Sequence, residues 1–327
     1  MRRREFITLL GGAAAAWPLA ARAQQPTLPV IGWLNSGTAA GYVDRMATFR
    51  EGLNEAGYTE GRNVAIEYRR AEIHIDRLPA LAADLAHRQV SVIAATGSPA
   101  AALAAKSATT LIPIVFETGA DPVQIGLVAS LNRPGGNITG VTNFSAELGA
   151  KRLGLLRELV PSATVLAILV NPTRPGGDAQ LAQEQEAAHA LGLSVHILKA
   201  TSDRDFDAVF QNLVELKAGA LVISTDALFN DRRDQIVALA RRYSVPTIYE
   251  FRQSVVAGGL MSYGAGDLDS YHQAGILTGR ILKGEKPADL PVLQPTKFEL
   301  VINMKTAKAL GITIPPGVLA ITDEVIE

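Results

Sequence analysis

The amino-acid sequence predicts an α/β fold of two Rossmann-like lobes, each built on a doubly wound parallel sheet. Short apolar runs alternate with longer segments of helical period between Val30 and Thr142, and the same rhythm begins again at Lys151. The chain has 327 residues, of which 48% are hydrophobic and 19% are charged, so it is long enough to bury two cores of this kind.

The first lobe is expected to contain five strands separated by four helices. Apolar residues at helical spacing, such as Met46 and Phe49, indicate the helices, and alternation at Val64, Ile66 and Tyr68 indicates one of the strands. Asp as N-cap and Pro in the first turn predict where the fourth helix begins. We expect strands at 30–34, 64–68, 90–95, 112–116 and 138–142, and helices at 46–56, 78–86, 100–106 and from Asp121-Pro122 to a point before Pro134.

The second lobe repeats this order. We expect helices at 151–160, 179–191, 206–216 and 232–243, and strands at 165–170, 195–198, 220–223, 247–249 and 260–263. A helix at 267–282, a proline-rich linker, a strand at 298–302 and a helix at 305–310 then follow. A tail of this composition results if the chain returns once more to each lobe.

The N-terminus predicts export. Three arginines, an apolar stretch from Phe6 to Ala20 and an A-x-A site at residues 21–23 are typical of a signal peptide cleaved after Ala23. The Arg3-Arg4 pair resembles the twin-arginine signal, and a general secretory signal is the alternative. We expect the mature protein to be soluble in the periplasm, because no later window of about 18 apolar residues is present that could span a bilayer.

Composition excludes several classes of partner and site. The net charge of −1 gives no reason to expect nucleic acid or an anionic membrane as a partner. The sequence contains no cysteine, which excludes disulfides, zinc–thiolate sites, cysteine nucleophiles and a lipid-modified cysteine anchor.

Motifs for catalysis are also missing. The five histidines lack metal-ligand spacing, Ser98 does not lie in a G-x-S-x-G motif, and Gly279–Gly284 is not followed by the Lys-Ser/Thr of a Walker motif. We therefore predict a binding protein without catalytic residues, cofactor or metal.

In open α/β sheets, ligands bind beyond the carboxyl ends of the strands. The residues at these ends form the candidate ligand site: Asn35, Thr96, Gly97, Ser98 and Glu117 in the first lobe, and Asn171, Asp226, Glu250 and Tyr263 in the second. An anion would lie at the helix start after Ser98, where free N–H groups and the helix dipole favour negative charge. An ammonium group would lie near Glu250 or Asp226. This division suits a zwitterionic or aromatic ligand.

Four of these residues have a local structural alternative. Ser98 could simply cap the helix that follows it, and Asp226 could cap a short turn. Asn35 and Asn171 are of a type that is frequent in turns. The sequence alone does not decide between ligand contact and a local role for these four residues.

Two others could have a structural role instead. Glu250 could be solvated or paired with Arg252, and Tyr263 could pack in a hinge. The shared location of all these residues at strand ends is a stronger indication than any one of them.

Four phrases of the sequence resemble a known family, the ABC transporter substrate-binding proteins of the tryptophan/tyrosine-binding type. The resemblance extends over nearly the whole mature chain. The phrases are ATGSPAAALAAK, IPIVFETGADPVQIGLVASLNRPGGNITGVTNF, PTIYEFRQSVVAGGLMSYG and QPTKFELVINMKTAKALGITIPP.

The resemblance implies the type I periplasmic binding fold, in which two lobes close on a ligand like a hinge. The lobes would comprise residues 28–143 plus 264–292 and residues 144–263 plus 293–327, with crossovers near 143–147, 263–266 and 290–296. It further implies that Ser98 and its backbone hold a carboxylate and that Glu250 faces an amine.

The resemblance also implies partners. They are a small-molecule ligand, which we expect to be an amino acid or an aromatic acid, and the permease and ATPase subunits of an ABC importer. We expect the receptor itself to be a monomer. One alternative is a ligand-sensing receptor coupled to a membrane sensor protein. A secreted α/β enzyme is the other, and it would need a nucleophile–base pair or a metal cluster, which the sequence does not offer.

Overall fold

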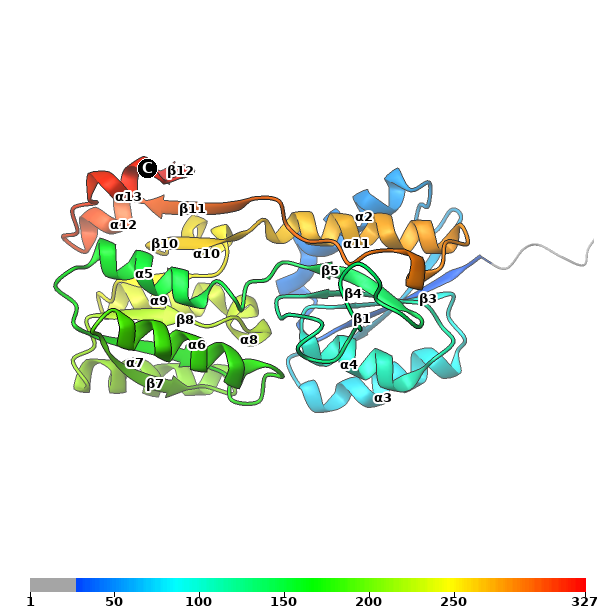
Figure 1. Ribbon diagram of the computed structural model, residues 1–327, viewed down its shortest axis with the longest axis horizontal. Coiled ribbons are helices and arrows are strands. Elements are labelled where there is room, and N and C mark those ends of the chain that lie inside the picture. Colours follow the sequence, from blue (N-terminus) through cyan, green and yellow to red (C-terminus); the bar gives the residue numbers. More distant parts are fainter. Residues whose placement is uncertain (1–27) are drawn as a thin grey trace, which may run out of the picture.

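A computed structural model describes residues 28–327 and contains two α/β lobes that lie side by side along the long axis of the molecule (Figure 1). The predicted export signal and its cleavage after Ala23 fall outside the described residues. Each lobe is organised around its own sheet, as the sequence predicts.

The first sheet has five parallel strands in the order β2-β1-β3-β4-β5. This order is one of the two common arrangements of doubly wound sheets, and its switch point lies between β1 and β3. The strands are β1 (Val30–Asn35), β2 (Ala65–Arg70), β3 (Val92–Thr96), β4 (Ile114–Thr118) and β5 (Ile138–Thr142). The helices of this half are η1 (Ala40–Tyr42), α2 (Val43–Glu55), η2 (Ile75–Arg77), α3 (Leu78–His87) and α4 (Pro99–Ala108).

Helices cover both faces of the first sheet, because alternate side chains of each strand point to opposite faces. Trp33 of β1 packs with Phe49 of α2 and Tyr271 of α11 (Asp267–Leu282) on one face. Leu34 packs with residues of α3 and α4 on the other. Figure 1 shows α2 and α11 above the sheet and α3 and α4 below it. The late helix at 267–282 therefore returns to the first lobe, as the sequence predicts.

The prediction of a helix from Asp121 to a point before Pro134 is wrong. Asp121 does accept hydrogen bonds from the N–H groups of Val123 and Gln124, as an N-cap would, but the segment forms only turns. Gly126 adopts a left-handed φ of 73°, which a continuing α-helix does not allow. The Lys106 ammonium donates a hydrogen bond to the carbonyl oxygen of Gly126. The Asp-Pro signal thus begins a turn that Gly126 ends, although Leu127 and Val128 after it still pack into the core of the first lobe.

The second sheet has seven strands in the order β12-β11-β10-β9-β8-β6-β7. All neighbours are parallel except β10 and β11, which are antiparallel. The strands are β6 (Val165–Val170), β7 (Ser194–Lys199), β8 (Ala220–Ile223), β9 (Thr247–Tyr249), β10 (Met261–Ala265), β11 (Phe298–Asn303) and β12 (Glu324–Ile326). The helices of this half and the tail are α5 (Gly149–Leu159), α6 (Gly177–Ala190), η3 (Asp203–Asp205), α7 (Phe206–Glu215), α8 (Ala227–Asp231), α9 (Arg233–Arg242), α10 (Arg252–Val256), η4 (Pro287–Asp289), α12 (Met304–Ala309) and α13 (Pro316–Ala320).

The chain passes between the two sheets three times. It leaves β5 for α5, leaves β10 for α11 at Gly266, and leaves the first lobe again after Leu293, which still pairs with Val141 of β5. The last crossing leads into β11, which adds an antiparallel strand to the second sheet. In Figure 1 this final segment runs along the upper side of the molecule from one lobe to the other. Within residues 28–327, no helix has the length and apolar character that a membrane span requires.

Candidate functional site

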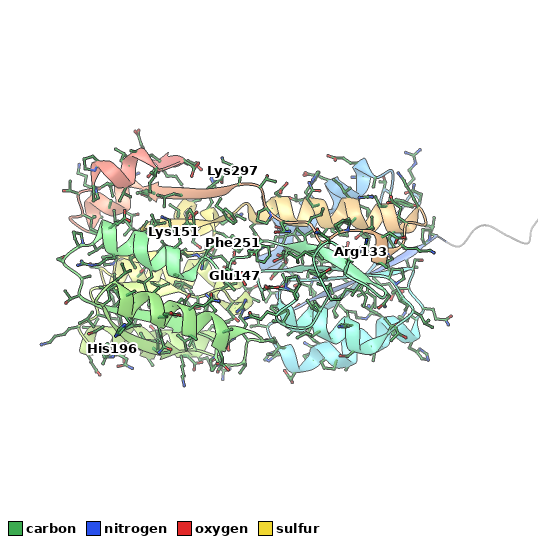
Figure 2. All side chains as sticks on the ribbon, in the orientation of Figure 1. Arg133, Glu147, Lys151, His196, Phe251 and Lys297 are labelled. Atoms are coloured by element: carbon green, nitrogen blue, oxygen red, sulfur yellow. The ribbon has the colours of Figure 1, made fainter. Side chains whose placement is uncertain are left out.

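A cavity of about 40 Å³ lies between the lobes, and both lobes contribute to its walls. Five of the residues predicted from strand ends line it: Gly97, Ser98, Glu117, Asp226 and Glu250. The strand-end rule therefore brings together groups that are up to 153 positions apart in the sequence. Phe251, another lining residue, lies between the two lobes in Figure 2, as does Glu147.

Ser98 and Gly97 form the mouth of α4 on the first wall. The Ser98 hydroxyl accepts a hydrogen bond from the N–H of Ala101, at 3.3 Å, so it caps the helix, and the same residue lines the cavity. Gly97 has a φ of 87°, and an added Cβ would lie 2.6 Å from the Tyr42 hydroxyl. Only glycine fits both this conformation and this space. The helix N-terminus thus opens onto the cavity.

Glu117 follows β4 and is almost completely buried. Its carboxylate accepts hydrogen bonds from the N–H of Gly97, at 3.2 Å, and from the side-chain amide of Asn143, at 3.3 Å. Burial and the neighbouring Asp267 carboxylate raise its pKa to about 7. Glu117 is therefore poised to exchange a proton near neutral pH.

Arg45 and Asp267 form a buried ion pair on this wall, with 2.8 Å between Arg45 Nε and Asp267 Oδ2. The guanidinium lies over the rings of Tyr42 and Tyr271, 4.7 and 5.8 Å from their centroids. Burial acts to lower the pKa of Arg45, but the Asp267 carboxylate outweighs it and raises that pKa. The pair holds α2 and α11 together at the cavity.

Asp226 begins α8 on the second wall. Its carboxylate accepts hydrogen bonds from the N–H of Leu228, at 2.9 Å, and from the side-chain amide of Asn171, at 3.2 Å. Burial raises its pKa, although Asn171 opposes this effect. Like Ser98, Asp226 is both an N-cap and part of the cavity wall.

Glu250 lies at the end of β9 and is 3% exposed. Its Oε2 accepts a hydrogen bond from the side-chain amide of Asn230, at 2.9 Å. Arg252 does not neutralise it, because that arginine forms a two-point ion pair with Glu324 instead. Glu250 is thus a buried carboxylate on the cavity wall without a cationic hydrogen-bond partner among the described residues.

Arg174 supplies a donor to the same wall. It is 8% exposed, and its Nη1 donates to Gln180 Oε1 at 3.2 Å. Its Nη2 is buried and has no hydrogen-bond partner in the described part of the chain, and the same holds for the Thr225 hydroxyl. Buried polar groups are nearly always paired. Two unpaired groups on the wall of one cavity therefore indicate that the cavity receives a polar ligand.

Four predicted residues do not line this cavity. Asn35 and Thr96 are buried and bond to each other, with 3.0 Å between Asn35 Nδ2 and Thr96 Oγ1. Asn171 lines a neighbouring small cavity and orients Asp226. Tyr263 packs against Phe298, with ring centroids 6.3 Å apart. These residues support the loops and the second lobe, and direct ligand contact by them stays a prediction.

Several lining residues were not predicted: Tyr42, Arg45, Asn143, Arg174, Asn230, Phe251, Asp267 and Tyr271. Most lie in first helical turns or in loops one step beyond the strand ends. One signal could have identified Arg45, since it is a charged residue next to Met46 on a helix face that also carries Phe49. A charge on an apolar helix face usually has a partner, here Asp267.

Sequence comparison identifies two relationships. The model of the family described as "ABC transporter substrate binding protein" matches residues 40–326. A "Tyrosine-binding protein" of Clostridioides difficile (strain R20291) is 28% identical over 262 residues, which cover 80% of this chain and 75% of the relative.

Two solved structures are similar in fold over nearly the whole chain. An ABC domain from Streptococcus pneumonia in complex with L-Trp is 25% identical, with a TM-score of 0.82 and coverage of 92% of this chain and 100% of the other. The ligand-free, open structure of a substrate binding protein with adhesive properties from Clostridium difficile is also 25% identical, with a TM-score of 0.62 and coverage of 91% and 99%. At equal identity, the structure as a whole is thus more similar to the complex than to the ligand-free, open structure.

Proposed function

The chain belongs to the family of ABC transporter substrate binding proteins, and from this premise we propose that it captures an amino acid in the cleft between its lobes. The family consists of solute-binding proteins, which agrees with the prediction that the chain is not an enzyme. The fold is that of type I periplasmic binding proteins.

The charge pattern of the cavity wall carries this proposal. Glu250 and Asp226 offer carboxylates to an ammonium group, while the α4 N-terminus at Ser98 and the unpaired Nη2 of Arg174 offer donors to a carboxylate. Four carboxyl groups and two guanidiniums line the cavity, so carboxyl groups outnumber the cations even when Glu117, whose pKa is raised to about 7, is protonated. This excess favours a ligand that carries an amine.

The relatives favour an aromatic amino acid. The curated relative is called a tyrosine-binding protein, and one similar structure holds L-Trp. Tyr42, Tyr271 and Phe251 supply aromatic rings to the cavity wall. We therefore take tyrosine and tryptophan as the first ligands to test.

Capture requires movement of the lobes. A cavity of about 40 Å³ is far below the roughly 300–1,000 Å³ of pockets that hold small-molecule ligands. The ligand would enter when the lobes separate about the three crossovers, and closure would then bring the two walls onto it.

Delivery and location are part of this proposal, and membership of the family supports them. We infer that the protein is exported, binds its ligand in the periplasm and passes it to a membrane permease driven by an ATPase. A receptor that reports to a membrane sensor instead is the second candidate, because the same cleft would serve either role. Permease and ATPase genes beside this gene would favour transport, and a sensor gene in their place would favour signalling.

The test is a calorimetric titration of the purified protein with tyrosine and tryptophan. Glu250→Gln keeps the shape of the side chain and removes its charge, so it should weaken binding of an amine-bearing ligand by more than about tenfold and leave folding intact. Glu158→Gln, at an exposed position of α5, is the matched control and should bind as the wild type does.

A thermal-shift screen extends the test to keto acids, sugars and nucleosides. A ligand at about 100 times its Kd should add roughly 2.7 kcal/mol of stability. Stabilisation by a sugar or nucleoside alone would contradict the amino-acid proposal. Unchanged affinity of Glu250→Gln for an amino acid that does bind would show that Glu250 does not face the amine.

A further inference from the structure

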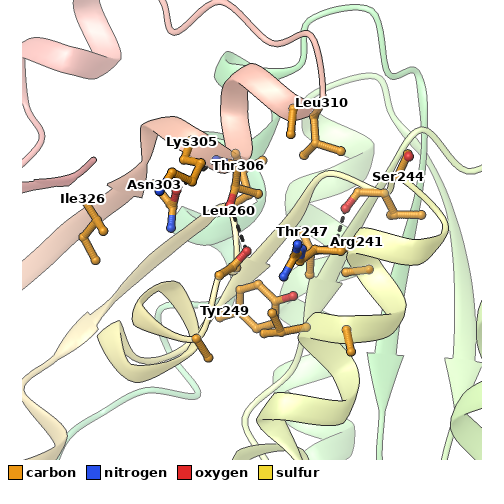
Figure 3. A pocket seen from close by; sticks show the side chains of 18 of the residues that line it. Arg241, Ser244, Thr247, Tyr249, Leu260, Asn303, Lys305, Thr306, Leu310 and Ile326 are labelled. Carbon is orange, nitrogen blue, oxygen red and sulfur yellow. Dashed lines mark hydrogen bonds between the residues drawn. The ribbon is translucent and has the colours of Figure 1, made fainter.

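A second cavity, of about 720 Å³, lies in the second lobe and shares no residue with the interlobe cavity (Figure 3). Its walls come from α9, β9, the turn between α10 and β10, and the segment from the end of β11 through α12, with Ile326 of β12. Strand β9 connects the two sites, with Thr247 at this cavity and Glu250 following the strand at the cleft. The volume lies within the range of small-molecule pockets, about 300–1,000 Å³.

The inner wall of the second cavity is apolar and carries one unpaired hydroxyl. Val237, Val245 and Leu260 are buried residues of this wall. Tyr249 is 3% exposed, and its hydroxyl has no hydrogen-bond partner among the described residues. The neighbouring Thr247 hydroxyl donates to the carbonyl oxygen of Val245 instead, at 3.0 Å. A buried tyrosine hydroxyl usually finds a partner. The Thr247 hydroxyl lies close enough to oppose the rise of the Tyr249 pKa that burial causes, and a polar atom of a ligand that reaches this wall would complete the pairing.

The outer wall is basic. Arg241, Arg242 and Lys305 are exposed and form no ion pair within residues 28–327, and Glu327 is the acidic residue among those that line the cavity. Figure 3 shows Arg241 on the side of Tyr249 and Thr247, with Lys305 on the segment across from them.

The helix dipole explains only part of this charge. Arg241 and Arg242 lie in the last turn of α9, where positive side chains complement the dipole in any protein. Lys305 lies in the first turn of α12, where the dipole disfavours a positive charge. The helix dipole therefore does not explain the positive charge of Lys305 beside the cavity, whereas an anion bound in the cavity would explain it.

We propose that this cavity binds a small amphipathic anion, such as an aromatic or aliphatic acid. The apolar part of the ligand lies on Val237, Val245 and Leu260, and its acid group lies between Arg241 and Lys305. A polar atom of the ligand pairs with the Tyr249 hydroxyl. This site is separate from the amino-acid cleft and does not depend on the function proposed for the cleft.

The test uses 8-anilinonaphthalene-1-sulfonate, an aromatic anion whose fluorescence rises on binding, with the full purified protein. Ala309 is an exposed residue at the end of α12 that lines the cavity, so Ala309→Phe fills part of it without disturbing a core. We expect this variant to bind the dye at least about tenfold more weakly than the wild type. Ala190→Phe, at the exposed end of α6, is the matched control and should change nothing.

A second comparison isolates the charge. Arg241→Gln combined with Lys305→Gln should weaken binding of the sulfonate about five- to tenfold. The same pair should not change binding of N-phenyl-1-naphthylamine, which is uncharged. The control pair is Arg204→Gln with Lys308→Gln, which removes the same charge from exposed positions outside the cavity.

Three results would overturn the proposal. The first is that neither dye binds saturably to the wild type. The second is that Ala309→Phe binds the sulfonate as tightly as Ala190→Phe does. The third is that the double variant of Arg241 and Lys305 binds both dyes more weakly by the same factor, which would show that charge does not select the ligand.

Discussion

Asp231 and Thr38 join the two lobes across the mouth of the cleft. Oδ1 of Asp231 accepts a hydrogen bond from the Thr38 N–H, at 3.1 Å, and a second from the Thr38 hydroxyl, at 2.7 Å. Gly41 lies beside this contact, and an added Cβ there would be 2.0 Å from the same oxygen. Its φ is not positive, so the position needs glycine only because the second lobe approaches it so closely.

This contact predicts that Gly41→Ala will hold the lobes apart. In the first lobe the new methyl group meets only the Thr38 hydroxyl, at 3.3 Å, but it collides with Asp231 when the cleft closes. Because ligand affinity depends on the population of the closed form, we expect affinity to fall about tenfold with stability nearly unchanged. Titration calorimetry measures the affinity, and small-angle scattering would detect the more open form. Gly154→Ala, where an added Cβ meets nothing within 4 Å, is the control, and equal affinity of both variants would contradict the prediction.

Glu117 predicts a specific dependence of stability on pH. Its pKa is about 7 in the folded protein, against an ordinary value of 4.5. The folded state therefore binds more protons than the unfolded state between these values, so this group favours folding at low pH, and its contribution is lost as pH rises from about 4.5 to 7. The upper limit of the effect is on the order of 3 kcal/mol.

Glu117→Gln isolates this contribution. The difference in free energy of unfolding between wild type and variant should decrease steadily from pH 4.5 to pH 7.5. Other carboxyl groups with raised pKa values, Asp226 and Glu184 among them, are present in both proteins and cancel in the difference. Urea unfolding of both proteins across this pH range measures the difference in free energy of unfolding. If that difference does not change with pH, the pKa of Glu117 is not raised in the folded protein.

Most elements of the fold could be predicted because each carries its own periodicity. Most strands of the two lobes are apolar runs, β2 shows alternation instead, and the helix at Asp267–Leu282 has the predicted bounds. The short helices α8, α10 and α13 and the strand β12 were not predicted. β12 has three residues and is defined by pairing with β11, which local sequence does not show.

The candidate site could be predicted only in part, for a reason of geometry. Strand ends can be read from the sequence, and they identified Ser98, Glu117 and Glu250. Arg45 and Asp267 are 222 positions apart and meet only because α11 returns to pack beside α2. No local sequence pattern contains this contact. The residues that first helical turns contribute to the cavity could therefore be identified only from the structure.

Arg152 predicts a large effect on stability. It is fully buried, its Nε donates to the Tyr263 carbonyl oxygen at 2.9 Å, and its Nη2 donates to the Ser145 carbonyl oxygen at 2.6 Å. Ser145 lies in the first crossover and Tyr263 just before the second, so one side chain ties two crossovers together. Arg152→Met leaves both carbonyl groups without this partner, and we expect a loss of about 3 kcal/mol. Lys151→Met, exposed on the same helix, should change stability by less than about 0.5 kcal/mol in urea unfolding, and a similar small change for Arg152→Met would exclude the clamp.

Arg174 predicts how the ligand carboxylate is recognised. Arg174 lines the cleft, and its Nη2 is buried without a partner in the described part of the chain. Arg174→Gln removes this unused donor together with the Nη1 hydrogen bond to Gln180. If this donor binds the carboxylate, tyrosine should bind the variant at least about tenfold more weakly than the wild type. Tyramine keeps the ring and the amine but lacks the carboxylate, so its affinity should fall much less in the variant. The two ligands are compared by calorimetry on wild type and variant, which corrects for any general change in the cleft. Equal losses for both would mean that Arg174 shapes the wall, and the carboxylate would then be assigned to the α4 N-terminus at Ser98 alone.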